Sequence, residues 1–285
     1  MANAITLAKT FVPLLDEVYK AAALTSVLDG APELARQGVN YDELIIPKMS
    51  MQGLADYNRN TGYVAGDVTL TNETVKCNFN RGRMFTVDAL DDQETVGIAF
   101  GRLAGEFIRT QVVPELDAFR LAAYASTASI GSADEDIADG AATVAAIRKG
   151  VTAMDEAEVP MTERYLFITP TLHGMIMDLD TTKSRSVLEG FAGIIDVPQT
   201  RFYSAITQTA GDAGGYTKEG SAKDINFMII HKPAVIQYQK HVVPKIITPE
   251  QNQTADAWKF GYRSVGIADV YENKVKGIYL NKKAT

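Results

Sequence analysis

The sequence has few of the residues from which catalytic centres and metal sites are commonly built. Its 285 residues include one cysteine, Cys77, and three histidines. One cysteine excludes a disulfide bond within the chain, and even the nearest two histidines, His231 and His241, are spaced more widely than paired zinc ligands. The glycine-rich phosphate loop, the dinucleotide-binding motif and the nucleophile elbow are also missing. We therefore predict no enzyme activity, no metal site and no cofactor.

The sequence also lacks a long hydrophobic run. Its longest mostly apolar stretch, residues 227–230, is far shorter than the ~20 residues that cross a bilayer. Residues 1–8 do not have the basic and then apolar pattern of a secretory signal. A net charge of -7 argues against a surface that clamps nucleic acid over its whole extent, although it allows a locally basic face. We expect a chain made in the cytoplasm, with no membrane partner.

The N-terminal region has helical periodicity. Apolar residues recur every three or four positions over residues 4–28, Pro13 interrupts the pattern, and Asp29-Gly30 ends it. The pattern fits an amphipathic helix that packs on its own core. It also fits an arm that packs on a neighbouring subunit, and the periodicity alone leaves both interpretations open.

Residues 40–88 are predicted to form an extended ribbon. A strand around Leu44–Pro47 is followed by a turn-rich segment and then by odd-numbered apolar residues from Val75 to Val87, which share one face of an extended chain. Such an apolar face needs another chain to cover it. Arg81 and Arg83 interrupt the pattern, and they are either solvated strand residues or charge partners for another chain or for phosphate.

Residues 89–129 carry the longest helical pattern. At about 1.5 Å per residue such a helix spans roughly 50 Å, so it must lie along a surface or act as a strut. Pro114 should kink or divide it. The acidic residues Asp88, Asp91, Asp92 and Glu94 are interpreted as favourable charges at the helix start. An acid–base or magnesium site is the alternative interpretation of this cluster.

The remainder of the chain mixes predicted helices and strands, which gives an α+β class. An acidic loop over residues 130–140 is the best candidate domain boundary. Helices are predicted over 141–157 and from Thr169-Pro170, where Pro170 suits the first helical position, and residues 179–224 are predicted to be mainly loops. The predicted strands are rich in apolar and β-branched residues, and they cover residues 164–168, 226–231, 234–239, 242–247, 259–269 and 270–279.

Several short strings occur in an order that resembles a known family. They are Leu54-Ala55-Asp56-Tyr57 with Arg59, Gly62-Tyr63 and Gly66-Asp67, then Asp88-Ala89-Leu90-Asp91-Asp92-Gln93-Glu94-Thr95, then Glu106-Phe107 and Pro114-Glu115-Leu116-Asp117-Ala118. Together with the sequence of predicted elements, they resemble the major capsid protein of tailed bacteriophages with the Hong Kong 97-type fold. The resemblance extends over essentially the whole chain.

The resemblance implies a division of the chain into four parts. They are an N-terminal arm at 1–39, an extended loop at 40–87, a peripheral domain at 88–132 with 241–285 that includes a long spine helix, and an axial domain at 133–240. In the family the arm and the loop lie across a neighbouring subunit, which would cover the apolar face of the ribbon. The implied candidates for contacts between subunits are Asp56, Tyr57, Arg59, Arg81 and Arg83.

The implied function is structural. Copies of the chain, as hexamers and pentamers, would close into the icosahedral shell of a virion that encloses double-stranded DNA, with assembly in the cytoplasm of the bacterial host. A portal is implied, and a separate scaffolding protein is inferred unless a scaffolding segment has already been removed. Contact with DNA is expected to be weak and non-specific. The alternatives are an encapsulin-type bacterial compartment shell and a soluble hydrolase that uses the acidic cluster.

Overall fold

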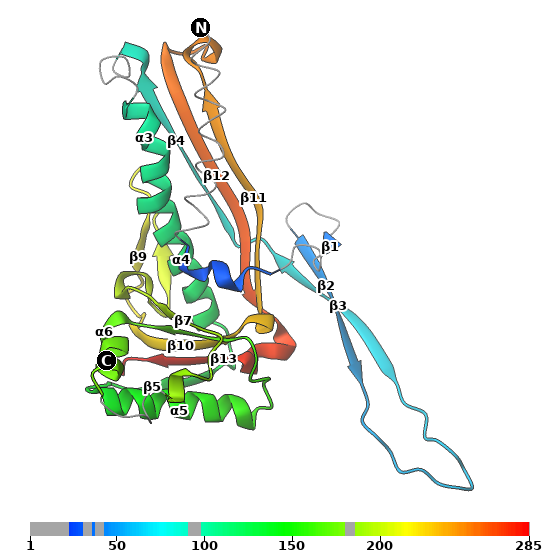
Figure 1. The fold of residues 1–285 in the computed structure, drawn as a ribbon. Helices are drawn as coiled ribbons and strands as arrows, with labels where there is room; N and C mark the ends of the chain where they lie inside the picture. Colours follow the sequence, from blue (N-terminus) through cyan, green and yellow to red (C-terminus); the bar gives the residue numbers. More distant parts are fainter. Residues whose placement is uncertain (1–22, 31–35, 38–42, 91–97, 180–185, 285) are drawn as a thin grey trace.

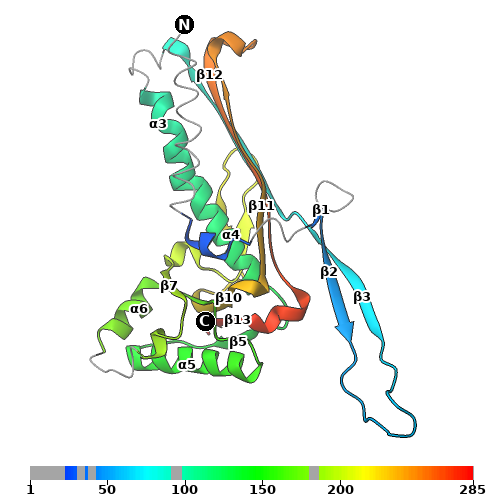
Figure 2. The same ribbon diagram turned by 45° about the vertical axis from the view of Figure 1, so that its right-hand side comes forward.

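A computed structural model describes residues 23–30, 36–37, 43–90, 98–179, 186–284 of the chain. The predicted helical region before residue 23, and Asp91, Asp92 and Glu94 of the acidic cluster, lie outside these residues. Three parts are visible: a base of sheet and helices, a long helix that rises from it beside three long strands, and a hairpin that projects to one side (Figure 1). The two views agree that the hairpin points away from the long helix (Figure 2).

The base is built on a five-stranded sheet that is covered on both faces. Its strand order is β5-β13-β10-β6-β7. The strands run over Gly131–Asp134 (β5), Arg164–Ile168 (β6), Gly193–Asp196 (β7), Ile225–His231 (β10) and Ile278–Lys282 (β13). Side chains of β10 alternate between two apolar clusters, Phe227 and Ile229 toward one and Met228 and Ile230 toward the other. Because both faces are buried, β10 has a continuous apolar sequence.

Helices supply the two covers of this sheet. Ile147 and Met154 of α5 (Gly140–Glu156) pack on one face together with α6 (Pro170–Met177). Leu121 and Tyr124 of α4 (Val113–Ala125) pack on the other, together with Leu28 from the short helix η1 (Leu24–Leu28). The predicted strand at 164–168 and the two predicted helices of this region are confirmed. Between residues 186 and 224 the described elements are short, as the sequence indicates: β7, η4 (Gln199–Arg201), β8 (Ile206–Gln208) and β9 (Tyr216–Lys218).

A long antiparallel sheet lies beside the long helix. Its order is β11-β12-β4, with β4 at Phe79–Asp88, β11 at Val235–Ile247 and β12 at Ala257–Val270. The helix consists of α3 (Ile98–Phe107), a π-helical segment (Ile108–Val112) and α4. Its apolar side chains meet aromatic residues of the sheet, and the cluster includes Phe79, Phe260, Tyr262, Ala104, Ile108, Val113 and Leu116.

The predicted division at Pro114 occurs as a π-helical turn. The N–H group of Val113 donates to the carbonyl of Ile108, and the backbone stays helical at Val112 and Val113. Pro114 directly follows this wider π-helical turn, and a π-helical turn is one of the devices that lets a helix accommodate a proline. The helix therefore continues past the proline.

The projecting hairpin has a fixed root. It pairs β2 (Glu43–Met51) with β3 (Val68–Lys76). The short strand β1 (Arg36–Gln37) pairs with β2 at the root of the hairpin. Val75 packs with Ile236 and Ile267 of the long sheet. Asn78 then clamps the chain to Ala268: its amide nitrogen donates to the Ala268 carbonyl at 2.7 Å, and its amide oxygen accepts from the Ala268 N–H at 3.1 Å.

Three sequence predictions need correction. The apolar face of residues 79–87 is covered by α3 and α4 of the same chain, not by a neighbour, because β4 pairs with β12 instead of continuing the hairpin. Residues 278–282, expected in the peripheral part, form β13 inside the base sheet. Residues 131–134, expected in a loop, form β5, which pairs in parallel with β13. Each error concerns a pairing between segments far apart in the chain, which local pattern does not specify.

A buried carboxylate joins the segment before the hairpin to the long helix. Asp117 of α4 is fully buried. It accepts hydrogen bonds from the Leu24 N–H at 3.1 Å, and from the N–H and hydroxyl of Thr25 at 3.1 and 2.8 Å. Burial raises the pKa of Asp117, and the hydrogen bonds from Thr25 and Leu24 oppose that rise. Arg201 also reaches the carboxylate, at 3.4 Å.

The network continues to the long sheet. Arg120 donates to the Thr25 hydroxyl at 2.8 Å. The amide of Gln237 in β11 donates to the Thr25 carbonyl and to Asp29, each at 2.7 Å, and accepts from the hydroxyl of Tyr124 at 2.8 Å. One short segment is thus tied to α4 and β11.

Replacing this carboxylate should be costly. We expect Asp117→Ala to lower the free energy of unfolding by about 3–5 kcal/mol, because the buried donors of Leu24 and Thr25 and the guanidinium of Arg201 lose their acceptor. Urea denaturation followed by circular dichroism measures the change. Asp178→Ala, at an exposed position after α6, should change stability by no more than about 0.5 kcal/mol. A loss below about 1 kcal/mol for Asp117→Ala would contradict the assigned role.

Candidate functional site

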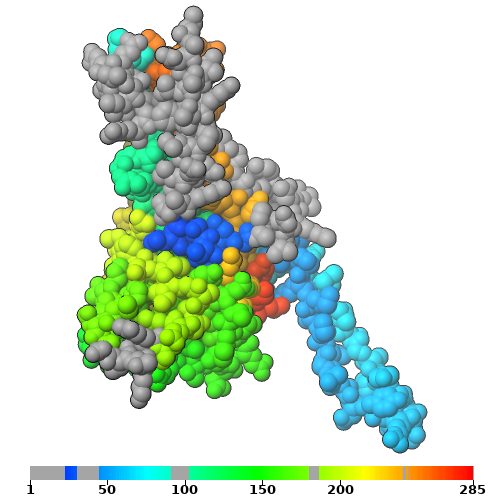
Figure 3. All heavy atoms as spheres, in the orientation of Figure 1, coloured from blue at the N-terminus to red at the C-terminus, as the bar shows by residue number. Residues whose placement is uncertain are grey.

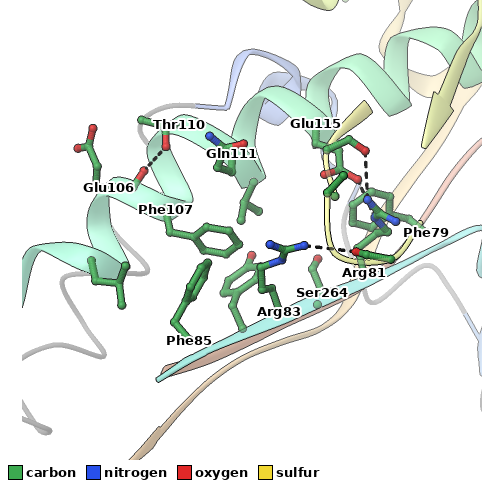
Figure 4. Close-up of a pocket in the computed structure, with 18 residues that line it drawn as sticks. Phe79, Arg81, Arg83, Phe85, Glu106, Phe107, Thr110, Gln111, Glu115 and Ser264 are labelled. Carbon is green, nitrogen blue, oxygen red and sulfur yellow. Dashed lines mark hydrogen bonds and ion pairs between the residues drawn. The ribbon is translucent and has the colours of Figure 1, made fainter. Parts of the chain in front are cut away.

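A cavity of about 490 Å³ lies between the long helix and the long sheet. Its walls come from β4 and β12 on one side and from α3 and the π-helical segment on the other, and a glycine-rich loop at residues 211–215 borders it (Figure 4). The strand pairing places Arg81 opposite Ser264 and Arg83 opposite Tyr262. Because residues directly opposite each other share a face, these four side chains form one patch that faces the helix.

Aromatic rings form the apolar part of the cavity. The ring centroid of Phe107 lies 4.8 Å from that of Phe85 and 6.2 Å from that of Tyr262, both in edge-to-face geometry. Phe79 packs against Phe119 of α4 at 5.0 Å. The odd-numbered residues of β4 are thus half-buried or buried within one chain.

Both arginines of β4 hold the glycine-rich loop. The Nε of Arg81 lies 2.7 Å from Glu115, and its Nη2 donates to the carbonyls of Thr209 and Gly215 at 3.0 and 3.1 Å. The Nη2 of Arg83 donates to the carbonyl of Asp212 at 2.6 Å. A side chain at Gly214, where φ is +62°, would come within 2.9 Å of that Nη2, so glycine lets the loop approach closely.

Ser264 and Arg83 are the polar groups of interest in the cavity. Ser264 is 1% exposed, and its hydroxyl has no hydrogen-bond partner among the described residues. Arg83 donates to the carbonyls of Gly211 and Asp212, and no carboxylate of the described part of the chain forms an ion pair with it. Glu106 and Gln111 lie at the exposed side of the cavity, and Glu106 is paired with Arg109 at 2.8 Å.

The tip of the hairpin is a second candidate surface. It stands clear of the body (Figure 3), and the apolar side chains on it are exposed. The exposed set comprises Met49, Met51, Leu54, Tyr57, Tyr63, Val64, Val68 and Leu70. The rings of Tyr57 and Tyr63 lie 4.9 Å apart, and a bridge between Asn58 and Gly62 closes the turn between them. Asp56 and Arg59, near Tyr57 in the sequence, are also exposed.

The structure separates the five predicted contact residues into two groups. Asp56, Tyr57 and Arg59 lie at the hairpin tip, whereas Arg81 and Arg83 line the cavity and bond within their own chain. Contact with another subunit stays a prediction for all five. Sequence reasoning missed Ser264, which nothing in the local pattern distinguishes. It also missed the ion pair that Arg81 donates to Glu115, although Glu115 belongs to one of the strings that carry the resemblance.

In the described segments, no three side chains of the histidine, cysteine, aspartate or glutamate type come together as a metal site. No described helix is both long enough and apolar enough to span a bilayer. Asp88, the one described member of the acidic cluster, accepts a hydrogen bond from the Leu90 N–H at 2.9 Å.

Comparison with solved structures decides the fold. No family model and no curated protein matches the sequence. A chain of Gordonia phage Cozz is 11% identical, with 93% of this chain and 87% of that chain covered and a TM-score of 0.60. The virus-like particle of Pyrococcus furiosus is 12% identical over 96% of this chain and 98% of that chain, with a TM-score of 0.59. The capsid structure of cyanophage P-SCSP1u is 11% identical over 88% and 86%, with a TM-score of 0.56.

The chain has the Hong Kong 97-type capsid fold. The predicted α+β class and the family fold inferred from the sequence are confirmed. In the terms of this fold, the continuous helix α3–α4 is the spine helix and the projecting hairpin is the extended loop. The cavity therefore lies beside the spine helix, and the exposed apolar tip belongs to the extended loop.

Loss of the arginine anchor should loosen the glycine-rich loop. We expect Arg81→Ala to increase amide hydrogen exchange over residues 205–218 by about tenfold or more, because two carbonyl contacts and an ion pair are removed. Mass spectrometry of peptic fragments measures the exchange. Arg148→Ala, at an exposed position of α5, serves as the matched control. Unchanged exchange in Arg81→Ala would show that the loop is held by other contacts.

Proposed function

We propose that this chain is a major capsid protein of a tailed bacteriophage, and that its copies assemble into an icosahedral shell around double-stranded DNA. The observation that carries the proposal is an apolar, exposed extended loop on a Hong Kong 97-type fold. Large contiguous apolar patches on a soluble protein mark surfaces that another molecule covers. Because solved structures with this fold include phage capsids, we infer that the covering molecule is another copy of the chain.

The burial pattern along β3 supports this reading. Residues 68–72 are all exposed, whereas Val75 near the root is buried against the long sheet. A two-stranded hairpin is only marginally stable on its own in water. Contact with a neighbouring subunit would stabilise the outer half of the hairpin and remove its apolar side chains from water.

A compartment shell of the encapsulin type is the second candidate function. The virus-like particle of Pyrococcus furiosus matches this chain about as well as the phage structures do. The strings of the extended loop and its length favour a phage protein. Under either reading the chain is a structural protein, and we assign it no enzymatic activity.

The proposal includes partners and a location. Copies of the chain would associate as hexamers and pentamers in the virion capsid, assembled in the host cytoplasm with a separate scaffolding protein and a portal. With a net charge of -7, contact between the wall and packaged DNA would be weak and non-specific. The axial domain would be centred on the five-stranded base sheet, and the peripheral domain on the spine helix and the long sheet.

Removing the hairpin tip should abolish shell formation. We expect a chain in which residues 52–67 are replaced by Asn-Gly, a sequence that favours a tight hairpin turn, to keep its circular dichroism spectrum and to form no closed particles by electron microscopy. Met161→Ser, at an exposed apolar residue of the base, serves as a control for loss of surface hydrophobicity. Normal shells from the shortened chain would contradict the role assigned to the hairpin.

The contents of the particles distinguish the two shell functions. Particles purified from the native source should contain double-stranded DNA, measured by nuclease protection, if the chain is a phage capsid protein. A protein cargo in particles without DNA, found by mass spectrometry, would favour the compartment shell. A chain that stays monomeric at high concentration, with or without a scaffold, would rule out both.

A further inference from the structure

We propose that the root of the projecting hairpin is a latch that acid tightens: Glu73 and Lys48 of the hairpin meet Glu272 of the body, and a neutral Glu73 holds the hairpin at one tilt. The inference concerns a single chain and goes beyond the proposed function, because it needs no assembly. It assigns a control of direction to an element that touches the body only at its root.

The latch is the outermost contact between the hairpin and the body. Asn78 clamps one end of the root, and Glu73 lies roughly 16 Å nearer the tip, at ~3.3 Å per residue of extended chain. Residues 68–72, beyond Glu73, are exposed. Within the described part of the chain, Lys48 and Glu73 are the last residues toward the tip that a hydrogen bond or ion pair joins to the body. A contact this far from the clamp has the longest lever against a change of tilt.

Strand pairing turns both charged side chains of the hairpin toward the body. Glu73 lies opposite Ile46, and Lys48 is two residues from Ile46, so the three share one face of the hairpin with Val75. This face packs on the body, because Ile46 and Val75 belong to a cluster that includes Tyr271. Glu73 is accordingly half-buried, although the rest of the outer strand is exposed.

Three carboxylates meet one cation at this contact. The Nζ of Lys48 lies 2.5 Å from the carboxylate of Glu272, the first residue of η7 (Glu272–Gly277). Glu73 interacts with Glu272, with Lys48 and with Asp269 of β12. The single ammonium group therefore does not balance the negative charge when all three acids are ionised.

The surroundings of Glu73 favour its neutral form. Burial, followed by the negative charge of Glu272, raises the pKa of Glu73; the backbone N–H of Glu272 and the charge of Lys48 oppose the rise only in part. The phenol of Tyr271 lies close enough for Glu73 to raise its pKa in turn, and Lys274 lies over the Tyr271 ring at 4.9 Å.

Docking of the hairpin therefore takes up a proton. The pKa of Glu73 is raised in the docked hairpin and returns to the ordinary value when the side chain swings into water. Stabilisation by the latch is thus complete below the ordinary pKa of a glutamate and is lost as the pH rises through the raised value. Since Glu73 is half-exposed, solvent screens the repulsion, and we expect a change of tilt without unfolding.

Pulsed electron paramagnetic resonance measures the tilt directly. In a Cys77→Ala background, spin labels at Leu70→Cys on β3 and Arg148→Cys on α5 report the distance from the hairpin to the base. The sample is the full-length chain, separated from any particles by gel filtration and diluted about tenfold with unlabelled chain, so that each labelled pair lies in one molecule. We expect the distance distribution to be about 1.5-fold wider at about pH 8 than at about pH 5. Equal widths would overturn the inference and leave the proposed function untouched.

Glu73→Gln removes the titrating charge and keeps the shape of the side chain. We expect this variant to give the narrow distribution at both pH values. Glu250→Gln, at an exposed position of η6 (Pro249–Gln251), is the matched control and should keep the response of the unaltered chain. A response that persists in Glu73→Gln would assign the pH dependence to another group, such as His231 beside Gly277, and the latch would be refuted.

An exchange of charges tests the ion pair of the latch. Lys48→Glu should widen the distribution at about pH 8, because four carboxylates then meet at the root. Adding Glu272→Lys places opposite charges across the contact again and should restore the original width. A double variant as wide as Lys48→Glu alone would show that the pair does not hold the hairpin, contrary to the inference.

Discussion

The hydrogen bonds to the buried carboxylate of Asp117 join the main parts of the molecule. Through it, residues 23–30 are fixed to the spine helix, and through Gln237 they are fixed to the long sheet. Isolated buried charges are costly, and this one is tolerated because each oxygen accepts hydrogen bonds and arginines lie nearby. The network holds the junction where the base, the spine helix and the long sheet meet.

Arg81 and Arg83 illustrate how far sequence reasoning reaches. Their positions on the strand face could be predicted from alternation, and both open interpretations were reasonable for charged residues in an apolar pattern. Which partner they take depends on residues about 130 positions away in the glycine-rich loop. No local pattern encodes such a contact. Ser264 is a clearer case, because only the pairing of β12 with β4 places it opposite Arg81 in the cavity.

Element types were predictable where the local signal is strong. The strand at 164–168 and the helix at 140–156 follow from apolar runs and helical periodicity, and Pro170 indicates a helix start. Which strands pair with each other was harder to predict from the sequence. The same alternation that predicts β4 as a strand cannot say that β12 and the spine helix cover it, and so the apolar face was assigned to a neighbour. The part of the ribbon that does lack a cover within the chain is the outer hairpin, where Val68 and Leu70 are exposed.

The place of β13 has a consequence for the order of events during synthesis. This strand, the last described in the chain, lies inside the base sheet between β5 and β10, and it carries core residues such as Ile278 and Leu280. Until residues 278–282 have been synthesised and have left the ribosome, β5 has no strand to pair with and β10 has one unpaired edge. A chain that stops before residue 278 therefore has an incomplete base sheet. The topology thereby delays completion of the base sheet until β13 has been made.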